Sequence, residues 1–89
     1  MATYKGWSNY ETWCARLWLG NDDLSWAFLR ETVEQEPDDH LAADHLKADM
    51  QESMPDLGAT LWTDLLTATL EEIDWCAIVA AVRRDLEEN

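Results

Sequence analysis

Basic residues are scarce in this sequence: six Lys and Arg stand against nineteen Asp and Glu, and the formal net charge is −13. A protein that binds nucleic acid directly needs a basic face, which displaces counterions from the phosphate backbone. A protein that lies on an anionic membrane needs a basic face as well. The charge therefore argues against direct binding of nucleic acid and against membrane association.

Cysteine and long apolar runs are scarce too. Cys14 and Cys76 are too few for the disulfide framework of a small secreted domain. Both lie in apolar helical runs, so we expect buried free thiols, with one bridge between them as the alternative. The N-terminus has no apolar signal-peptide region, and no stretch reaches the length of a membrane span. These features predict a protein of the reducing cytoplasm.

Motifs for catalysis are missing. The three glycines, Gly6, Gly20 and Gly58, are isolated, so there is no glycine-rich phosphate loop. Cys14 belongs to an apolar stripe, where a reactive thiolate is disfavoured, and no family signature pairs it with a histidine. We therefore expect neither enzyme activity nor a cofactor.

A group of potential metal ligands occurs in residues 40–52. His45, Asp49 and Glu52 would line one side of a helix, and His40 precedes them. Carboxylate-rich metal sites, however, draw ligands from facing helices, often as paired Glu-x-x-His motifs. This chain has one histidine-bearing helix and no such motif. A solvated helix face is therefore the favoured interpretation, and no metal is expected.

Apolar residues are abundant: 47% of the 89 residues are hydrophobic, and six residues are tryptophan. This composition argues against a disordered chain, and the length allows one domain. No run alternates apolar and polar residues for long enough to predict a confident strand. We predict an all-α fold, a compact orthogonal bundle of four or five short helices in a single domain over residues 1–89. Residues 1–7 are predicted to form a short extended arm.

Capping residues and helix breakers predict where the helices begin and end. Ser8 and Glu11 have the spacing of a capping box, and Gly20 and Asn21 tolerate the left-handed conformation that ends a helix. The connections should be only two to four residues long. The later predicted boundaries are a start at Asn21, Asp22 and Asp23, a stop before Pro37, a start at Asp38 and Asp39, a stop at Met54 and Pro55, a start after Asp56 and an N-cap at Asp74.

Apolar residues recur at helical spacing and identify the expected core. The stripe of the first helix is Tyr10, Trp13, Cys14, Leu17 and Trp18, and that of the last helix is Trp75, Ile78, Val79, Val82 and Leu86. Four tryptophans lie on such stripes and are expected to be buried: Trp13, Trp18, Trp62 and Trp75.

The other two tryptophans lie at the edges of the expected helices. Trp7 would fold back before the Ser8 cap as a hydrophobic staple. Trp26 lies toward the edge of its apolar arc, where an exposed aromatic ring beside acidic residues could anchor a protein partner.

The acidic residues are concentrated in two segments. Residues 31–56 hold nine acidic residues and one lysine, a net charge of −8, and residues 71–89 contribute −4. Such a charge destabilises a compact domain through self-repulsion, so it indicates a use beyond solubility. The candidate residues for contacting a partner are Glu34, Glu36, Asp38, Asp39, Asp44, Asp49 and Glu52.

Segments near both ends of the chain carry a family resemblance. The first is YKGWSNYETW at residues 4–13, with LWL at 17–19 and ND at 21–22; the second is LWTDLL at 61–66 with LEEIDW at 70–75. Both are similar to segments of a family of short proteins encoded by bacteriophages, plasmids and integrated elements. That family has no established activity, so the resemblance implies no catalytic residues, and it does not extend to the acidic residues 31–56.

An origin in a mobile element gives the charge a meaning. As a class, small acidic proteins of such elements resemble anti-CRISPR and antirestriction inhibitors that imitate DNA. Carboxylates one helical turn apart are separated by about 5–6 Å, comparable to successive phosphates of one DNA strand. We predict a non-enzymatic inhibitor that occupies the basic DNA-reading surface of a bacterial host defence protein, such as the PAM-reading surface of a CRISPR effector. The alternative is a helical adaptor with apolar contacts, whose acidity only keeps it soluble.

Overall fold

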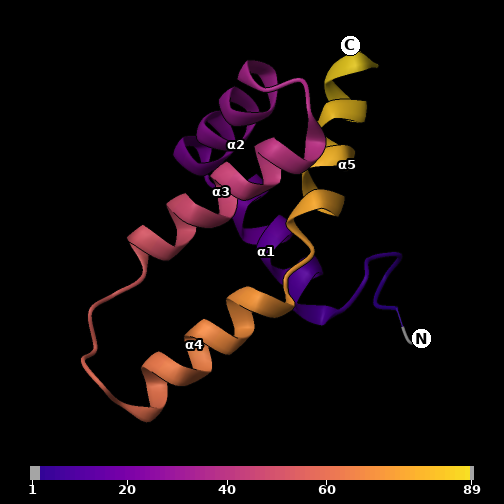
Figure 1. Cartoon of the computed structure of the whole chain (residues 1–89). Coiled ribbons are helices and arrows are strands. Elements are labelled where there is room, and N and C mark those ends of the chain that lie inside the picture. The colour runs from indigo at the N-terminus through magenta and orange to yellow at the C-terminus, as the bar shows by residue number, and fades with distance from the viewer. Residues whose placement is uncertain (1–2, 89) are drawn as a thin grey trace.

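Five α-helices make up the computed structural model, which describes residues 3–88 (Figure 1). They are α1 (Tyr10–Asn21), α2 (Asp23–Gln35), α3 (Asp39–Ser53), α4 (Leu61–Glu72) and α5 (Trp75–Glu87). Residues 3–88 contain no β-strand, only an isolated bridge between Tyr4 and Trp7. The predicted all-α bundle of short helices is confirmed. In the described part of the chain, no helix has the length and apolar character needed to cross a membrane.

A side-chain N-cap begins each described helix, because its oxygen accepts an amide hydrogen that the first turn leaves unpaired. Asp22, Asp38 and Asp74 cap α2, α3 and α5, which confirms the predicted starts. The predicted cap at Ser8 is wrong, because Asn9 caps α1. The Ser8 hydroxyl instead donates to Asp74 at 2.6 Å. α1 ends at Asn21, which confirms the predicted stop, but neither Gly20 nor Asn21 adopts the left-handed conformation that was expected there.

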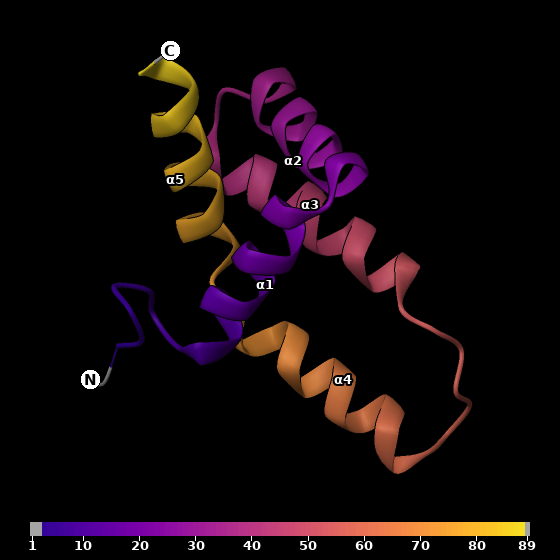
Figure 2. The same cartoon turned by 180° about the vertical axis from the view of Figure 1, so that it is seen from behind.

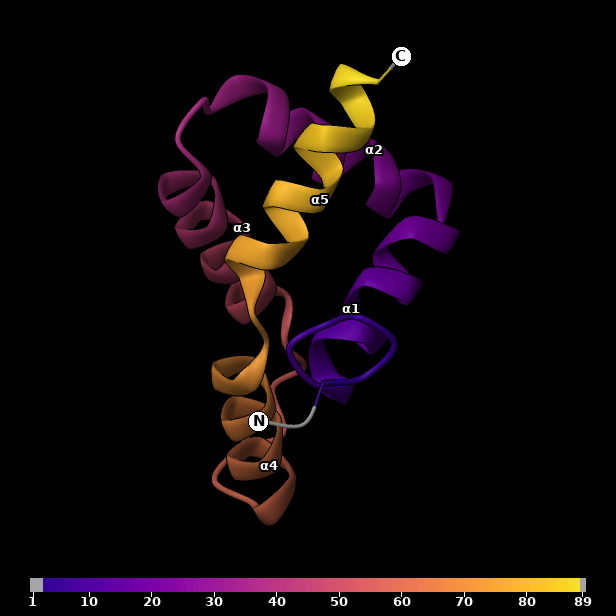
Figure 3. The same ribbon diagram turned by 90° about the vertical axis from the view of Figure 1, so that its right-hand side faces the viewer.

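The hydrophobic core lies where α5 packs against α3 and α2 (Figure 1, Figure 3). α5 contributes Trp75, Ile78, Val79 and Val82, four buried residues of its predicted stripe. Full burial of one aliphatic side chain of this size stabilises the fold by about 1.5–3 kcal/mol. The buried residues that α2 and α3 add are Leu29, Val33, Ala42, Ala43 and Leu46.

The face of α1 that packs against the core is the one opposite to its predicted apolar stripe. Trp18 is 71% exposed, so its predicted burial is wrong, and Tyr10 and Leu17 are exposed as well. The residues of α1 that pack inward are the fully buried Thr12 and the half-buried Ala15 and Leu19.

A network of polar contacts explains this orientation of α1. The Thr12 hydroxyl accepts from the Asp74 amide at 2.8 Å and donates to Asn9 Oδ1 at 2.6 Å. The Asn9 amide group donates to the Glu72 carbonyl at 2.7 Å. We call this network, together with the Ser8–Asp74 contact, the α1–α5 joint. It brings together the two segments that carry the family resemblance, and it can form only if Thr12 faces inward.

α4 leaves the other helices at the joint and extends away from them (Figure 1, Figure 2). None of its residues is buried, and Trp62 is 63% exposed, so the predicted burial of Trp62 is wrong. The connection before α4, residues 54–60, is seven residues long and exceeds the predicted two to four residues. The reason is that α4 begins after Thr60, its N-cap, and not after Asp56. The radius of gyration, 13.4 Å, exceeds the about 12 Å typical of this length, in keeping with a projecting helix.

The N-terminal arm is a tight turn, not the predicted extended segment. Lys5 and Gly6 both have positive φ angles, and two backbone hydrogen bonds join Tyr4 to Trp7. The turn places the Tyr4 ring 5.0 Å from the ring of Trp13 and Lys5 Nζ 4.9 Å from the Trp13 ring centre. Trp13 is therefore half-buried by the arm, and Trp7 packs against the core. Residues 1 and 2 of the predicted arm lie outside the described residues.

Candidate functional site

Four of the seven candidate acidic residues are engaged within the protein. Glu34 forms an ion pair with an arginine one turn earlier in α2, at 3.3 Å, and Asp39 forms one with Arg83 Nε at 2.6 Å. Asp38 caps α3, and its own amide donates to Glu36 Oε1 at 3.1 Å. Asp38 and Asp39 help to hold the α2–α3 connection in place, so these two carboxylates are less available to a partner.

The other three candidates, Asp44, Asp49 and Glu52, lie on α3. Asp44 and Glu52 are exposed, and Asp49 is half-buried. The acidic residues Glu87 and Glu88 lie at the far end of α5, and α3 runs away from that end (Figure 1, Figure 3). The tertiary structure therefore separates the acidic residues of α3 from the C-terminal ones.

An acidic hollow of about 360 Å³ lies between α2 and α3. The carboxylates of Glu31, Glu36 and Asp49 line it, together with His45 and the ring of Phe28. A lysine or arginine side chain can lay its aliphatic stem on an apolar surface while its charged end meets carboxylates. The hollow thus has the chemistry to receive one basic side chain of another protein.

The basic residues of the chain are almost all engaged internally. Arg16, Arg30, Lys47 and Arg83 form ion pairs, and Lys5 lies over aromatic rings. Within residues 3–88, Arg84 is the one Lys or Arg side chain with neither kind of contact. The large excess of carboxylates is therefore not neutralised within the fold.

The structure brings Cys76, rather than Cys14, close to a histidine. Cys76 Sγ lies 3.7 Å from His40 Nδ1. Burial raises the pKa of the Cys76 thiol, and the carboxylates of Asp39 and Asp74 raise the pKa further. A nucleophilic cysteine needs the opposite shift, because the thiolate is the reactive form. Both cysteines are free, as expected, and are half-buried rather than buried.

The four potential metal ligands occupy different surroundings. His40 lies beside Cys76, His45 and Asp49 line the acidic hollow, and Glu52 is exposed. Among residues 3–88, no three His, Cys, Asp or Glu side chains lie close enough together to hold a metal ion.

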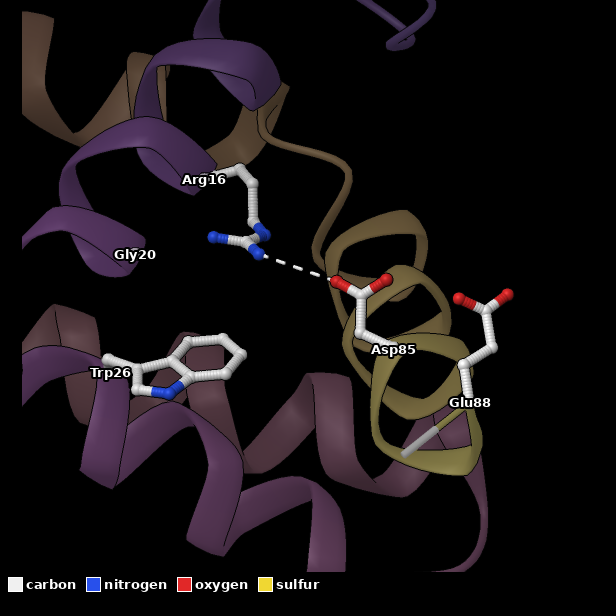
Figure 4. Close-up of a pocket in the computed structure, with 5 residues that line it drawn as sticks. All are labelled: Arg16, Gly20, Trp26, Asp85 and Glu88. Carbon is white, nitrogen blue, oxygen red and sulfur yellow. Dashed lines mark ion pairs between the residues drawn. The ribbon is translucent and has the colours of Figure 1, made fainter.

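A second hollow, of about 410 Å³, lies between α1, α2 and the end of α5 (Figure 4). The Arg16 guanidinium lies 5.2 Å from the ring centre of Trp26 and 3.7 Å from Asp85. Gly20 makes room for this guanidinium, because a Cβ at residue 20 would collide with it. Trp26, considered as an anchor for a partner, is therefore partly covered from within by Arg16.

An apolar hollow of about 380 Å³ lies between α1 and α4. Tyr10, Cys14 and Trp18 line it from α1, and Thr69 of α4 and Ile73, the residue that caps the end of α4, line its other side. The exposed apolar side chains that surround or continue this hollow form what we call the α1–α4 apolar face: Tyr10, Trp18, Leu61, Trp62, Leu65 and Leu66.

This face is the functional candidate that sequence reasoning missed. Its tryptophans lie on regular apolar stripes, which normally indicate a core. One signal in the sequence does distinguish α4: residues 57–70 contain a single charged residue, Asp64, in a chain with 28% charged residues. An apolar segment so poor in charge can serve as an interface as well as a core.

Comparison with known proteins identifies a family but no activity. The chain matches, over residues 1–85, the model of a family described as a family of unknown function (DUF7249), so it belongs to that family. This match includes the acidic residues 31–56, to which the resemblance seen in the sequence did not extend. No curated protein and no solved structure gives a significant match.

Proposed function

We propose that this member of a family of unknown function is a non-enzymatic inhibitor that binds a basic, DNA-binding protein. The carboxylates of α2 and α3 occupy the surface that the partner uses to hold DNA. The observation that supports the proposal best is the acidic hollow between these helices, lined by Glu31, Glu36 and Asp49. It combines an apolar wall with several carboxylates, which suits the side chain of an arginine or lysine.

The charge of the whole molecule supports the same proposal. Ion pairs and ring contacts engage five of the six basic residues, so the chain presents a net negative field to its surroundings. Long-range attraction to a basic surface raises the association rate, and the few pairs that lose water on binding set the dissociation rate. A basic DNA-binding surface is the partner that this field selects.

The identity of the partner is proposed by analogy. Among basic DNA-binding proteins, we propose a bacterial host defence protein, such as the PAM-reading subunit of a CRISPR effector. Two resemblances support this choice: segments of the chain are similar to a family of short mobile-element proteins that has no established activity, and small acidic proteins of mobile elements resemble, as a class, inhibitors that imitate DNA. The proposed place of action is accordingly the cytoplasm of a bacterial host.

A helical adaptor with apolar contacts remains the second candidate, and the exposed α1–α4 apolar face favours it. The two functions respond differently to salt. Binding of the acidic surface to a basic partner weakens steeply as the ionic strength rises, whereas binding through apolar contacts changes little.

The test begins with capture of the partner from a bacterial lysate and its identification by mass spectrometry. Binding is then compared for the wild type and for the triple variant Asp44→Asn, Asp49→Asn, Glu52→Gln, which nearly preserves side-chain shape. We expect at least about a tenfold loss of affinity at low salt, a parallel loss of inhibition, and competition between DNA and the wild type.

A matched control separates local contacts from net charge. The variant Asp23→Asn, Asp64→Asn, Glu72→Gln removes the same number of charges from exposed side chains outside α3. It should bind almost as well as the wild type. The proposal is contradicted if the α3 triple variant inhibits fully and DNA does not compete.

A further inference from the structure

The α1–α4 apolar face is large for a chain of this size. Trp18 and Trp62 are both mostly exposed, and Leu61, Leu65 and Leu66 are exposed beside Trp62. α4 is the most apolar of the five described helices and yet contains no buried residue. Large exposed apolar patches on small proteins mark interaction surfaces.

The side chains of α4 form one continuous line toward α1. Trp62, Leu66, Thr69 and Ile73 are spaced at i, i+4, i+7 and i+11, so they share one side of the helix. Thr69 and Ile73 already line the hollow with α1. Trp62 and Leu66 therefore continue the same apolar line past the end of that contact, where α4 extends away from the other helices (Figure 2).

The charge around this face identifies what can cover it. Glu11 lines the hollow of this face, and Asp64 is the one charged residue in residues 57–70, so two acidic residues accompany six large apolar side chains and the face offers few charges to a basic partner. No lysine or arginine lies in α4, which argues against an anionic lipid surface as well. Two such faces can cover each other's apolar side chains, and the repulsion between their few carboxylates is one that salt screens.

We propose that a second copy of this chain covers the α1–α4 apolar face in a symmetric homodimer. In such a dimer the same patch serves both partners, so α4 of each copy packs against α1 and α4 of the other. Complete burial of the exposed surface of these six side chains would remove roughly 700 Å² per copy from water, close to the about 800 Å² per partner of a standard stable interface. The acidic hollow between α2 and α3 is lined by none of these residues.

The net charge makes this association distinctive. Two chains that each carry −13 repel one another at long range, so the dimer is opposed at low ionic strength. Added salt screens the repulsion, and the dimer therefore tightens as salt rises. Binding of the acidic surface to a basic partner has the opposite dependence, so failure of either proposal can be recognised separately.

The test is sedimentation velocity of the full chain over a range of protein concentrations at low and high sodium chloride. We expect a species of twice the 10.3 kDa chain mass, more abundant at high salt. The double variant Leu61→Gln, Leu65→Gln should weaken dimerisation at least about 100-fold, since each substitution counts twice in a symmetric dimer. Circular dichroism should show an unchanged fold, because neither leucine is buried.

A matched control uses two exposed leucines elsewhere. The variant Leu24→Gln, Leu41→Gln changes side chains of α2 and α3 that are also exposed, and it should dimerise like the wild type. Hydrogen exchange should slow in α4 as the protein concentration rises. The proposal is overturned if the wild type stays monomeric under all conditions, if the Leu61 and Leu65 variant dimerises normally, or if only an unrelated protein covers the face.

Discussion

α4 and α5 are neighbours in the chain and similar in length, but they contribute to the fold in different ways. α5 buries four residues between α3 and α2, whereas α4, the more apolar helix, buries none. The difference lies in position, because α5 is covered by two helices while α4 extends away from the bundle (Figure 1). The comparison shows that apolar character alone does not place a helix in the core. Other helices must also pack against its apolar side.

The largest expected effect is a loss of stability when a tryptophan of α5 is replaced, compared with the same replacement in α4. Trp75→Ala removes a ring that is 6% exposed and whose indole nitrogen donates to the Leu70 carbonyl at 3.2 Å. We expect a loss of about 3–5 kcal/mol in the free energy of unfolding, which approaches the whole stability of a small domain. Urea melts measure this loss.

Trp62→Ala in α4 is the matched control. Its ring is mostly exposed, so dilute protein should lose no more than about 0.5 kcal/mol in the same urea melts. Equal losses for the two variants would show that α4 is packed as firmly as α5, and the distinction between the helices would be wrong.

The next effect concerns the α1–α5 joint, from which α4 extends. Thr12→Val keeps the shape of a fully buried side chain but leaves the Asp74 amide without its acceptor. We expect a destabilisation of about 1–3 kcal/mol, measured by thermal or urea unfolding. Thr12→Ser retains the hydroxyl and should restore most of the hydrogen bonding. A Val variant as stable as the Ser variant would show that the joint does not hold α1 in its orientation.

A smaller effect is expected at the opposite end of α5. Arg83 donates to the carbonyls of Val33 and Glu36 and pairs with Asp39, so it ties α5 to the α2–α3 connection. Arg83→Gln should destabilise the protein by about 1–2 kcal/mol. The exposed pair of Arg30 provides a control, since Arg30→Gln should cost less than about 0.5 kcal/mol. Hydrogen exchange of α4 should respond to neither variant.

The smallest expected effect is a dependence of the stability on pH, and it comes from one residue of α5, Cys76. Because the pKa of Cys76 is raised above its ordinary value of 9.0, the unfolded chain loses this proton first. Its contribution to stability is therefore complete below pH 9.0 and declines as the pH rises above it. In a Cys14→Ala background, alkylation of Cys76 should have its midpoint above pH 9.0.

A cysteine introduced into α4 extends the comparison of α4 with α5 to thiol reactivity. Thr67 is exposed, so Thr67→Cys in a background without Cys14 and Cys76 should be alkylated faster at pH 8 than Cys76 is. Urea should remove the difference in rate between the two thiols. A slower reaction at residue 67 would indicate that α4 is covered in the monomer.

Local signals in the sequence were sufficient for most of the secondary structure. The helix class, the caps Asp22, Asp38 and Asp74, and the buried stripe of α5 follow from hydrogen-bonding side chains and from apolar spacing within about one turn. The acidic excess is likewise a property of composition. The candidate acidic residues, by contrast, were divided by the fold: Asp38 and Asp39 act within it, while Asp44 and Glu52 face outward.

The sequence by itself therefore determined an all-α chain of short capped helices with a strong negative charge. Only the tertiary structure decided which apolar stripes enter the core. α1 has an apolar stripe, yet the hydrogen bond that the Asp74 amide donates to Thr12, across 62 residues of sequence, turns the opposite face inward. Trp18 and Trp62 are consequently left outside. Apolar spacing in the sequence indicates that a helix has an apolar side, but contacts between segments distant in sequence determine which side is buried.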